Sequence, residues 1–551
     1  MTPEEADAEA HRAVLGGKGP GRPGPDLARS TAAMTALTLA SRLTGLVRVL
    51  VVAAVLGTTF LGNTFQSANS VPNLVFELFA AGALQAVMIP TLVQLLDRGD
   101  RDEAGYVAGS LLGLALAVLA VVAAVGMLAA PWVMRVLVAG VASPEVRDAQ
   151  VHLGTVLLWF FLPQVVLYAA GMVATALLNA DGRFALPVAA PIANNLVVVA
   201  SCWLFWQLRH GAPPDLDLTA AQTVVLGAGT TLGVLALSAL PLMAVVRRGF
   251  SLRPRFDLGH PSVRRVVRQS GWAALFLVAT QILLGVVLVL ANAVEGGVVA
   301  YQVAYTLFLV PHALFALPVL TALFPTLARN AAVGDDVAYA RTVASGVRAI
   351  AYLVLPAAAA LAALSGPLAR LLLFGAGRSG TAAVASAVLA FAPGLVGYGA
   401  FIFLARALYA RGDTRTPGLV HLGVVGVAAV AMAALSGVVD GPGRVAALAA
   451  AHSGAYLAGA VVLGARVRQR MPPQFRPALA RPLVAGAAAA AAAGAAMWLV
   501  QQPIPTAGRL ASLAAVVVAG TVGVAVYLGA QVALAGTRPG AVVALLRGAD
   551  G

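Results

Sequence analysis

The stretch that decides the fold is residues 41–94, SRLTGLVRVLVVAAVLGTTFLGNTFQSANSVPNLVFELFAAGALQAVMIPTLVQ. It predicts two apolar helices joined by a short turn, GTTFLGN, at residues 57–63. Each helix is long enough to cross a bilayer, which takes about 20 predominantly apolar residues. Both helices also carry polar side chains that lipid would reject, so the stretch predicts two membrane spans that face a polar interior.

Two arginines lie inside the first of these helices. Arg42 and Arg48 are six residues apart, which is about 9 Å of helical rise. A charge at bilayer depth costs roughly 2.5–3.5 kcal/mol on insertion scales, so both side chains are expected to face a bundle interior or a wet cavity. The alternative is that an arginine near a helix end extends to the headgroups. The apolar run VLVVAAVL after Arg48 argues against that alternative for this residue.

The chemistry of these arginines is electrostatic. Arginine presents a planar fork of donors that matches phosphate oxygens two at a time. Arg42 and Arg48 therefore predict a cationic cavity that holds a diphosphate. Other polar side chains at membrane depth are candidates for the same cavity wall: Asn63, Asn73, Glu77, Gln281 and Gln302. Each Asn or Gln could instead make an ordinary hydrogen bond between helices, and Glu77 needs a proton or a cationic partner such as Arg42 or Arg48.

The composition of the chain excludes a soluble domain. Hydrophobic residues make up 60% of the 551 residues and charged residues 11%, and the mean hydropathy is +0.89. The net charge of +14 is not a nucleic-acid footprint, because the arginines are scattered between apolar spans rather than gathered on one face. The single cysteine, Cys202, lies in an apolar run and offers neither a disulfide nor a metal site.

The whole chain predicts an all-α polytopic membrane protein of about 14 transmembrane helices. The expected spans are residues 31–57, 65–96, 106–138, 148–178, 184–208, 219–246, 270–294, 298–328, 342–373, 381–409, 417–437, 445–465, 482–501 and 510–535. A basic loop at 247–269 separates two predicted six-helix lobes. The expected divisions are a disordered tail at 1–30, an N-lobe at 31–246, a C-lobe at 270–465, a second basic loop at 466–481, two further helices at 482–535 and a tail at 536–551. Spans 2 and 8 both end in a proline-threonine-leucine segment, which favours a duplicated transporter with pseudo-symmetric lobes.

The distribution of positive charge predicts the orientation of the chain. Most of its 36 lysines and arginines fall in the two tails and in the loops that follow even-numbered spans. The intervening loops hold only five: Arg147, Arg209, Arg378, Arg444 and Arg509. By the positive-inside rule, both termini are cytoplasmic.

No pattern in the sequence is typical of an enzyme. The 7 histidines are scattered without metal-ligand spacing, and there is no P-loop. His312, inside span 8, could line a pathway or could pack with a hydrogen bond. We therefore expect a transporter with no catalytic residues, no metal and no cofactor.

An ordered series of motifs runs along the chain: SRLTGLVR at 41–48, PNLVFELFAAGALQAVMIPTL at 72–92, LNADGRFALPVAAPIANN at 178–195, AYQVAYTLFLVPHALFALPVLTALFPTLAR at 300–329 and ARALYARGDTRTP at 405–417. The series resembles the MviN/MurJ family of lipid II flippases, of the multidrug/oligosaccharidyl-lipid/polysaccharide exporter superfamily. The resemblance covers about residues 32–470, and the last two spans match only by position and hydrophobicity.

This resemblance implies two lobes around a central cationic cavity, with the last two helices forming a lipid-facing groove. The implied activity is alternating-access transfer of lipid II, an undecaprenyl-diphosphate-linked peptidoglycan precursor, from the inner to the outer leaflet of the bacterial cytoplasmic membrane. Arg42 and Arg48 match the family's cavity arginines. Membrane lipids and proteins of cell-wall synthesis and division are the implied partners, and membrane potential or a cation is the implied energy source.

The chain also departs from the family pattern. Val49 and Asn63 stand where many members have acidic residues, and Phe76 and Glu77 stand where some have paired arginines. Thr306 aligns with an arginine of those members. These departures bear on the coupling mechanism and on the identity of the lipid. The alternatives are a diverged paralogue that flips another polyprenyl-linked glycan, a non-transporting scaffold for envelope assembly, and a cation-coupled exporter of small molecules.

Overall fold

The computed structural model describes residues 25–79, 81–257, 259–260, 263–264, 271–472, 480–504 and 508–535, and these segments are helical between short turns. Residues 1–24 and 536–551 of the predicted tails and parts of both basic loops lie outside the described residues. The expectation of a disordered tail is wrong for residues 25–30, which form the start of α2. The helices are α2 (Pro25–Leu56), α3 (Phe60–Phe79), α4 (Ala81–Asp97), α5 (Arg101–Leu137), α6 (Pro144–Phe161), α7 (Gln164–Ala180), α8 (Ala185–Leu208), α9 (Ala220–Arg247), α11 (Gly271–Asn292), α12 (Gly297–Pro311), η1 (His312–Ala316), α13 (Leu317–Ala332), α14 (Asp336–Ala363), α15 (Ser365–Leu372), η2 (Gly375–Gly380), α16 (Thr381–Ala410), α17 (Arg415–Ser436), α18 (Gly443–Gln469), α19 (Ala480–Gln501) and α20 (Arg509–Ala535).

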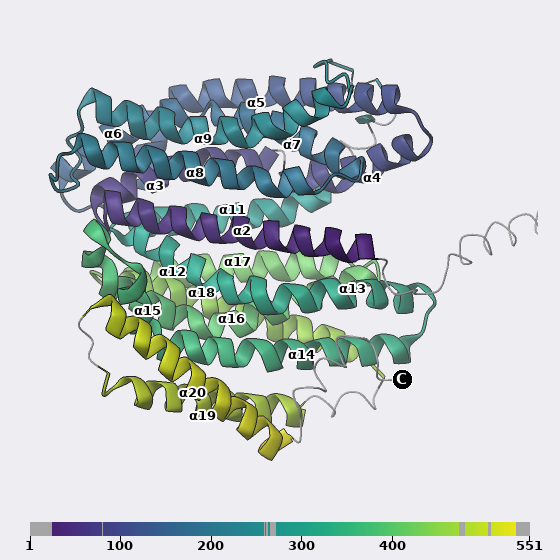
Figure 1. Ribbon diagram of the computed structural model, residues 1–551, viewed down its shortest axis with the longest axis vertical. Helices are drawn as coiled ribbons and strands as arrows, with labels where there is room; N and C mark the ends of the chain where they lie inside the picture. Colours follow the sequence, from purple (N-terminus) through teal and green to yellow (C-terminus); the bar gives the residue numbers. More distant parts are fainter. Residues whose placement is uncertain are drawn as a thin grey trace, which may run out of the picture.

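The predicted membrane architecture is confirmed. In the described part of the chain, 12 helical segments are long and apolar enough to cross a membrane. The two other predicted spans, 65–96 and 270–294, contain the shorter apolar helices Met88–Asp97 and Leu277–Asn292. The protein is a multi-span membrane protein whose helices run roughly side by side (Figure 1).

The helices form two lobes and an appended pair (Figure 1). In the N-lobe, which we define as α2–α9, α8 packs against α2 and α9, and α7 packs against α9. In the C-lobe, α11–α18, the helix α16 packs against α14 and α18, and α17 packs against α18. The appended helices α19 and α20 pack against each other and against α14. Because α2 lies along the N-lobe next to the C-lobe, its residues can reach both (Figure 1).

The two lobes repeat one turn structure. In the N-lobe, Asp181 follows α7 and pairs with Arg248 beyond α9, at 2.8 Å between carboxylate and guanidinium. In the C-lobe, Asp413 follows α16 and pairs with Arg470 beyond α18, at 2.7 Å. The pKa of Asp413 lies below its ordinary value. Burial of the carboxyl acts to raise the pKa, but hydrogen bonds from Thr416 and Arg470 and the positive charge of Arg470 lower it by more. Corresponding ion pairs at corresponding turns fit the pseudo-symmetric lobes expected from the sequence.

The predicted span at 342–373 is wrong at its end, because α14 stops at Ala363 and α15 is a separate helix. Pro367 has no backbone N–H to donate to the carbonyl of Ala363, so the helix loses its next hydrogen bond there. Gln501, at the end of α19, donates its side-chain amide to that carbonyl at 2.6 Å. The appended helices therefore satisfy the end of α14.

The first basic loop packs closely against α5 where α5 carries glycines. A Cβ on Gly109 or Gly113 would overlap the backbone of Arg253 or Arg255, so only glycine permits this approach. Arg255 donates its backbone N–H to the carbonyl of Gly109 at 3.1 Å, and the Tyr106 hydroxyl donates to Asp257 at 2.8 Å. The chain is thus held against the N-lobe before it enters the C-lobe.

Candidate functional site at the interface of the lobes

The two lobes are joined by polar contacts near the end of α2. Thr58 and Ser379 share a hydrogen bond at 2.8 Å. Asn63 is fully buried at the start of α3; its amide donates to the carbonyl of Val294 at 2.8 Å and accepts from the N–H of Val298 at 3.0 Å. We call the joined end, made by residues 57–63, 294–298 and 375–380, the gate. The structure therefore gives Asn63, predicted as a cavity residue, two backbone contacts across the gate.

Small residues let the backbones of the gate approach closely. Gly296 and Gly375 both have positive φ, at 67° and 57°, which strains residues with a side chain. A Cβ on Gly296 would also overlap Thr58, and one on Gly380 would crowd the same residue. A second buried contact reinforces the gate, because Asn292 on α11 donates to Ser67 on α3 at 2.8 Å. The gate is therefore closed in this structure.

Arg48 faces the N-lobe. Asn195 on α8 donates to the hydroxyl of Thr44 at 3.1 Å, which fixes this face of α2 against α8. Arg48 lies one turn further along the same face and is half-buried. Its guanidinium is within electrostatic range of Tyr168 on α7 and Cys202 on α8. Arg48 thus lies near the middle of the candidate span Ala36–Leu56 and is directed into protein.

Arg42 faces the other way. Six residues separate it from Arg48, which places the two side chains about 120° apart around the helix. Arg42 is exposed, as are its neighbours Leu39 and Leu43 at 47% and 56%, so no other helix covers this part of α2. The ring of His312, in η1 of the C-lobe, is within electrostatic range of Arg42. The uncovered face of α2 therefore carries a positive charge toward the C-lobe.

Both arginines are free of protein partners. No hydrogen bond or ion pair joins either guanidinium to a residue that the structure describes. Glu77 is half-buried on α3, and no ion pair joins it to either arginine, so of the two alternatives for this residue the structure does not show the cationic partner. The donors of Arg42 and Arg48 are available to an anionic ligand.

The remaining predicted polar residues differ in their surroundings. Gln302 on α12 is half-buried, and its side-chain oxygen is buried without a hydrogen-bond partner among the described residues. Gln281 on α11 is half-buried. Asn73 donates to the carbonyl of Asn69 within α3 at 2.9 Å. Gln302 is therefore the member of this set whose polar atom is both buried and without a hydrogen-bond partner among the described residues.

Sequence reasoning missed the residues of the gate other than Asn63. Thr58, Ser379 and Gly380 belong to turns far apart in the chain, and only the packing of the lobes brings them together.

His312, a possible pathway residue by its position in the sequence, packs edge-on against Tyr398 at 4.7 Å between ring centroids. Its Nδ1 is buried without a hydrogen-bond partner among the described residues.

Comparison with known proteins decides the family of this chain. A family model described as "Lipid II flippase MurJ" matches residues 52–519. The chain belongs to the MurJ family. The match begins after Arg42 and Arg48, so it decides membership and leaves the roles of the two arginines open.

Individual MurJ relatives agree with the family match. The "Probable lipid II flippase MurJ" of Rhizobium tropici is 31% identical over 384 residues, which are 69% of this chain and 70% of the relative. The "Lipid II flippase MurJ" of Burkholderia cenocepacia is 28% identical over 404 residues, covering 73% and 76% of the two chains. The family is one of transporters rather than enzymes.

Solved structures confirm the fold. A structure described as "Lipid II flippase MurJ, inward closed conformation" superposes with a TM-score of 0.73 at 18% identity, covering 91% of this chain and 98% of the other. An inward-facing transporter of the multidrug resistance MATE family superposes with a TM-score of 0.62 at 14% identity, covering 80% and 97%. The chain therefore has the two-lobed fold of MurJ and of the wider transporter superfamily.

Proposed function

We propose that this chain moves lipid II from the inner to the outer leaflet of the bacterial cytoplasmic membrane by alternating access between its two lobes. Membership of the MurJ family supports the substrate class. The observation that carries the proposal within this chain is the pair of guanidinium groups on α2 that, at membrane depth, have no hydrogen bond or ion pair to any described residue.

Two unpaired guanidinium groups within a span cost free energy unless they bind a ligand. An arginine within a span needs a partner, water or a ligand, because the bilayer interior supplies no hydrogen bonds. Arg48 is directed to the N-lobe and Arg42 toward the C-lobe, so the two guanidinium groups offer donors to a diphosphate on two faces of α2. Bidentate contacts from two guanidinium groups suit a diphosphate with its several oxygens. Gln302 would add one polar group from α12.

The orientation of the chain follows from its basic loops. With the loops at 247–269 and 466–481 in the cytoplasm, both termini are cytoplasmic and the gate lies at the outer end of the bundle. A closed outer gate and an uncovered face of α2 around Arg42 correspond to a state that receives substrate from the cytoplasmic side. Transport then requires the gate contacts to break and the opposite end to close. We propose the lobe boundaries 31–246 and 270–465 on the same basis.

Depletion and complementation test this function. Cells depleted of the protein are complemented with wild type, Arg42→Ala, Arg48→Ala or the double variant, and the lipid-linked precursor in each leaflet is measured. We expect depletion to trap precursor in the inner leaflet, and wild type alone to restore it to the outer leaflet. Arg135→Ala is the matched control, because Arg135 is an exposed arginine in the last turn of α5, away from α2.

Two results would overturn the proposal. Precursor that still reaches the outer leaflet after depletion would favour a scaffold or a paralogue with another lipid. A double variant that transports as well as wild type, at equal protein level, would remove the arginines from the mechanism while leaving the family assignment in place.

A further inference from the structure

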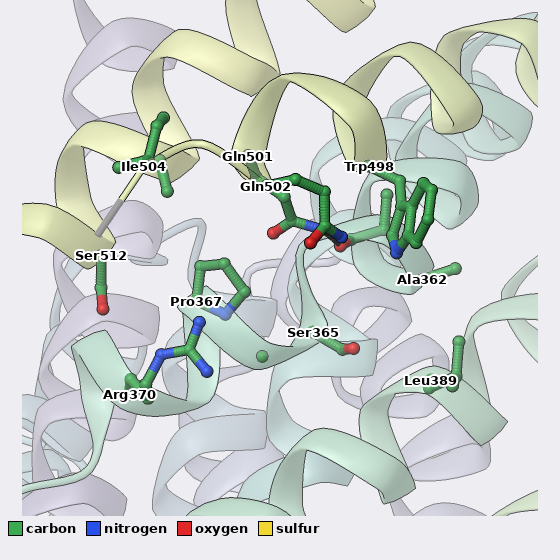
Figure 2. Close-up of a pocket in the computed structure, with 13 residues that line it drawn as sticks. Ala362, Ser365, Pro367, Arg370, Leu389, Trp498, Gln501, Gln502, Ile504 and Ser512 are labelled. Atoms are coloured by element: carbon green, nitrogen blue, oxygen red, sulfur yellow. Dashed lines mark hydrogen bonds between the residues drawn. The ribbon is translucent and has the colours of Figure 1, made fainter. Parts of the chain in front are cut away.

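A cavity separate from the central arginines lies between the C-lobe and the appended helices (Figure 2). It measures about 380 Å³, which is within the range of small-molecule sites. Its walls come from the end of α14, from α15, and from the facing ends of α19 and α20. Since α15 immediately precedes η2, the cavity is at the gate end of the bundle.

The chemistry of this cavity is cationic. Its polar side chains are Ser365, Arg370, Gln501, Gln502 and Ser512, and none of the 13 lining residues is Asp or Glu. Figure 2 shows the guanidinium of Arg370 turned into the cavity, with the two glutamines on the opposite wall. The first residues of α15 also line it, and the N–H groups at a helix start carry partial positive charge.

Arg370 has no partner in the part of the chain that the structure describes. Its Nε is buried, and neither a hydrogen bond nor an ion pair joins the side chain to any described residue. A buried donor without a partner costs free energy that a bound acceptor would recover. No hydrogen bond joins Arg370 to Gln501, whose side-chain amide donates to the carbonyl of Ala363. The cavity therefore contains a guanidinium group without an anionic partner among the described residues.

An apolar groove continues from the cavity. It measures about 670 Å³, lies between α14, α16, α18 and α19, and shares Ala362, Ala363 and Trp498 with the cavity. Its lining is apolar throughout, mostly alanines of α14 and α19. Trp498 is 54% exposed at the junction, and tryptophan favours the level of the lipid headgroups. The apolar groove and the cationic cavity thus meet at that level.

We propose that the cavity and groove bind one anionic phospholipid of the leaflet at the gate end, with its phosphate on Arg370 and an acyl chain in the groove. One guanidinium matches one phosphate, and the alanine-lined groove matches a hydrocarbon chain. The site lies outside the space between the lobes, so the proposal stands independently of the transported substrate. Its occupant joins α14 and α15 to α19 and α20.

Native mass spectrometry of the purified, delipidated protein tests this site with dioleoylphosphatidylglycerol as the probe. We expect one bound lipid on wild type and at least a fivefold lower bound fraction for Arg370→Gln. Ala495→Phe, which fills the groove from its exposed side, should lower binding similarly without touching the arginine. Arg378→Gln is the matched control, because Arg378 is an exposed arginine at the same end, and its binding should equal that of wild type.

The comparison ligands separate the sources of phosphate. Dioleoylphosphatidylcholine, with the same chains and no net charge, should bind more weakly than the anionic lipid. Displacement by an equal concentration of inorganic phosphate would overturn the role of the groove, and preference for undecaprenyl diphosphate would overturn the choice of a phospholipid. Equal binding by Arg370→Gln and wild type would overturn the site itself. Arg370→Lys, which keeps the charge but not the fork, should bind to an intermediate extent.

Discussion

Replacing Asn63 with alanine tests whether the gate contacts hold the lobes together. The Asn63 side chain is fully buried; its nitrogen donates to the carbonyl of Val294, between α11 and α12, and its oxygen accepts from the N–H of Val298, at the start of α12. Asn63→Ala leaves the carbonyl of Val294 and the N–H of Val298 without these partners. Because both contacts cross between lobes, their loss destabilises the closed gate relative to any state in which the lobes separate there.

The size of the effect follows from the two bonds. Removing one partner of a buried hydrogen bond costs about 1–3 kcal/mol, so the pair is worth about 2–4 kcal/mol when some relaxation is allowed. Since about 1.4 kcal/mol is a factor of ten in an equilibrium constant, the open population should rise about 30- to 1,000-fold.

Thiol labelling of a gate residue measures that population. In a Cys202→Ala background, Thr58→Cys places a single thiol at a gate position that is 6% exposed. The purified protein in lipid nanodiscs is labelled with a maleimide, and the rate is compared with and without Asn63→Ala. We expect labelling to accelerate at least tenfold.

A matched control separates gate opening from general loosening. Gln164 is also a fully buried amide, but it donates to the hydroxyl of Thr231 at 2.8 Å, between α7 and α9 of the N-lobe and outside the gate. Gln164→Ala should lower stability without accelerating the labelling of residue 58. Unchanged labelling in Asn63→Ala, or equal acceleration in Gln164→Ala, would refute the assignment of the gate.

Two further predictions concern the cytoplasmic ends of the helices in the proposed orientation. Gly109→Leu should lower the free energy of unfolding by about 1–3 kcal/mol, because its side chain would overlap the backbone of Arg253. Thermal unfolding measures this loss, with Gly285→Leu as the control because no atom lies within 4 Å of a Cβ added there. Equal losses of stability in the two variants would contradict the prediction. Asp413→Asn should destabilise the protein at neutral pH, and its difference from wild type should shrink as pH falls through the lowered pKa of Asp413, because wild type then loses the same charge beside Arg470. A pH-independent difference in thermal unfolding would show that charge is not the cause.

The local sequence was a good guide to the spans and to the charges inside them. Runs of apolar residues predict helices that cross a membrane whatever their neighbours, because each backbone group must be satisfied within its own helix. Arg42 and Arg48 were identifiable for the same reason, since a charge within such a run is unfavourable unless it has a function. The runs misled at helix ends and interruptions, such as Ala363, where α14 ends before Pro367, and the predicted span 65–96, which is divided between α3 and α4.

The functions of individual polar residues depended on long-range packing. Asn63 and Gln302 are both uncharged polar residues within spans, yet one joins the lobes and the other keeps an unused oxygen. Hydrogen-bond partners of the gate are more than 200 residues apart in the chain, so no local pattern distinguishes them. The sequence by itself determined a membrane bundle with two charges inside one span, because bilayer energetics act on each helix alone. Only the tertiary structure decided that Arg48 faces the N-lobe, that Arg42 faces the C-lobe and that the lobes meet at one end, because these depend on which helices pack together.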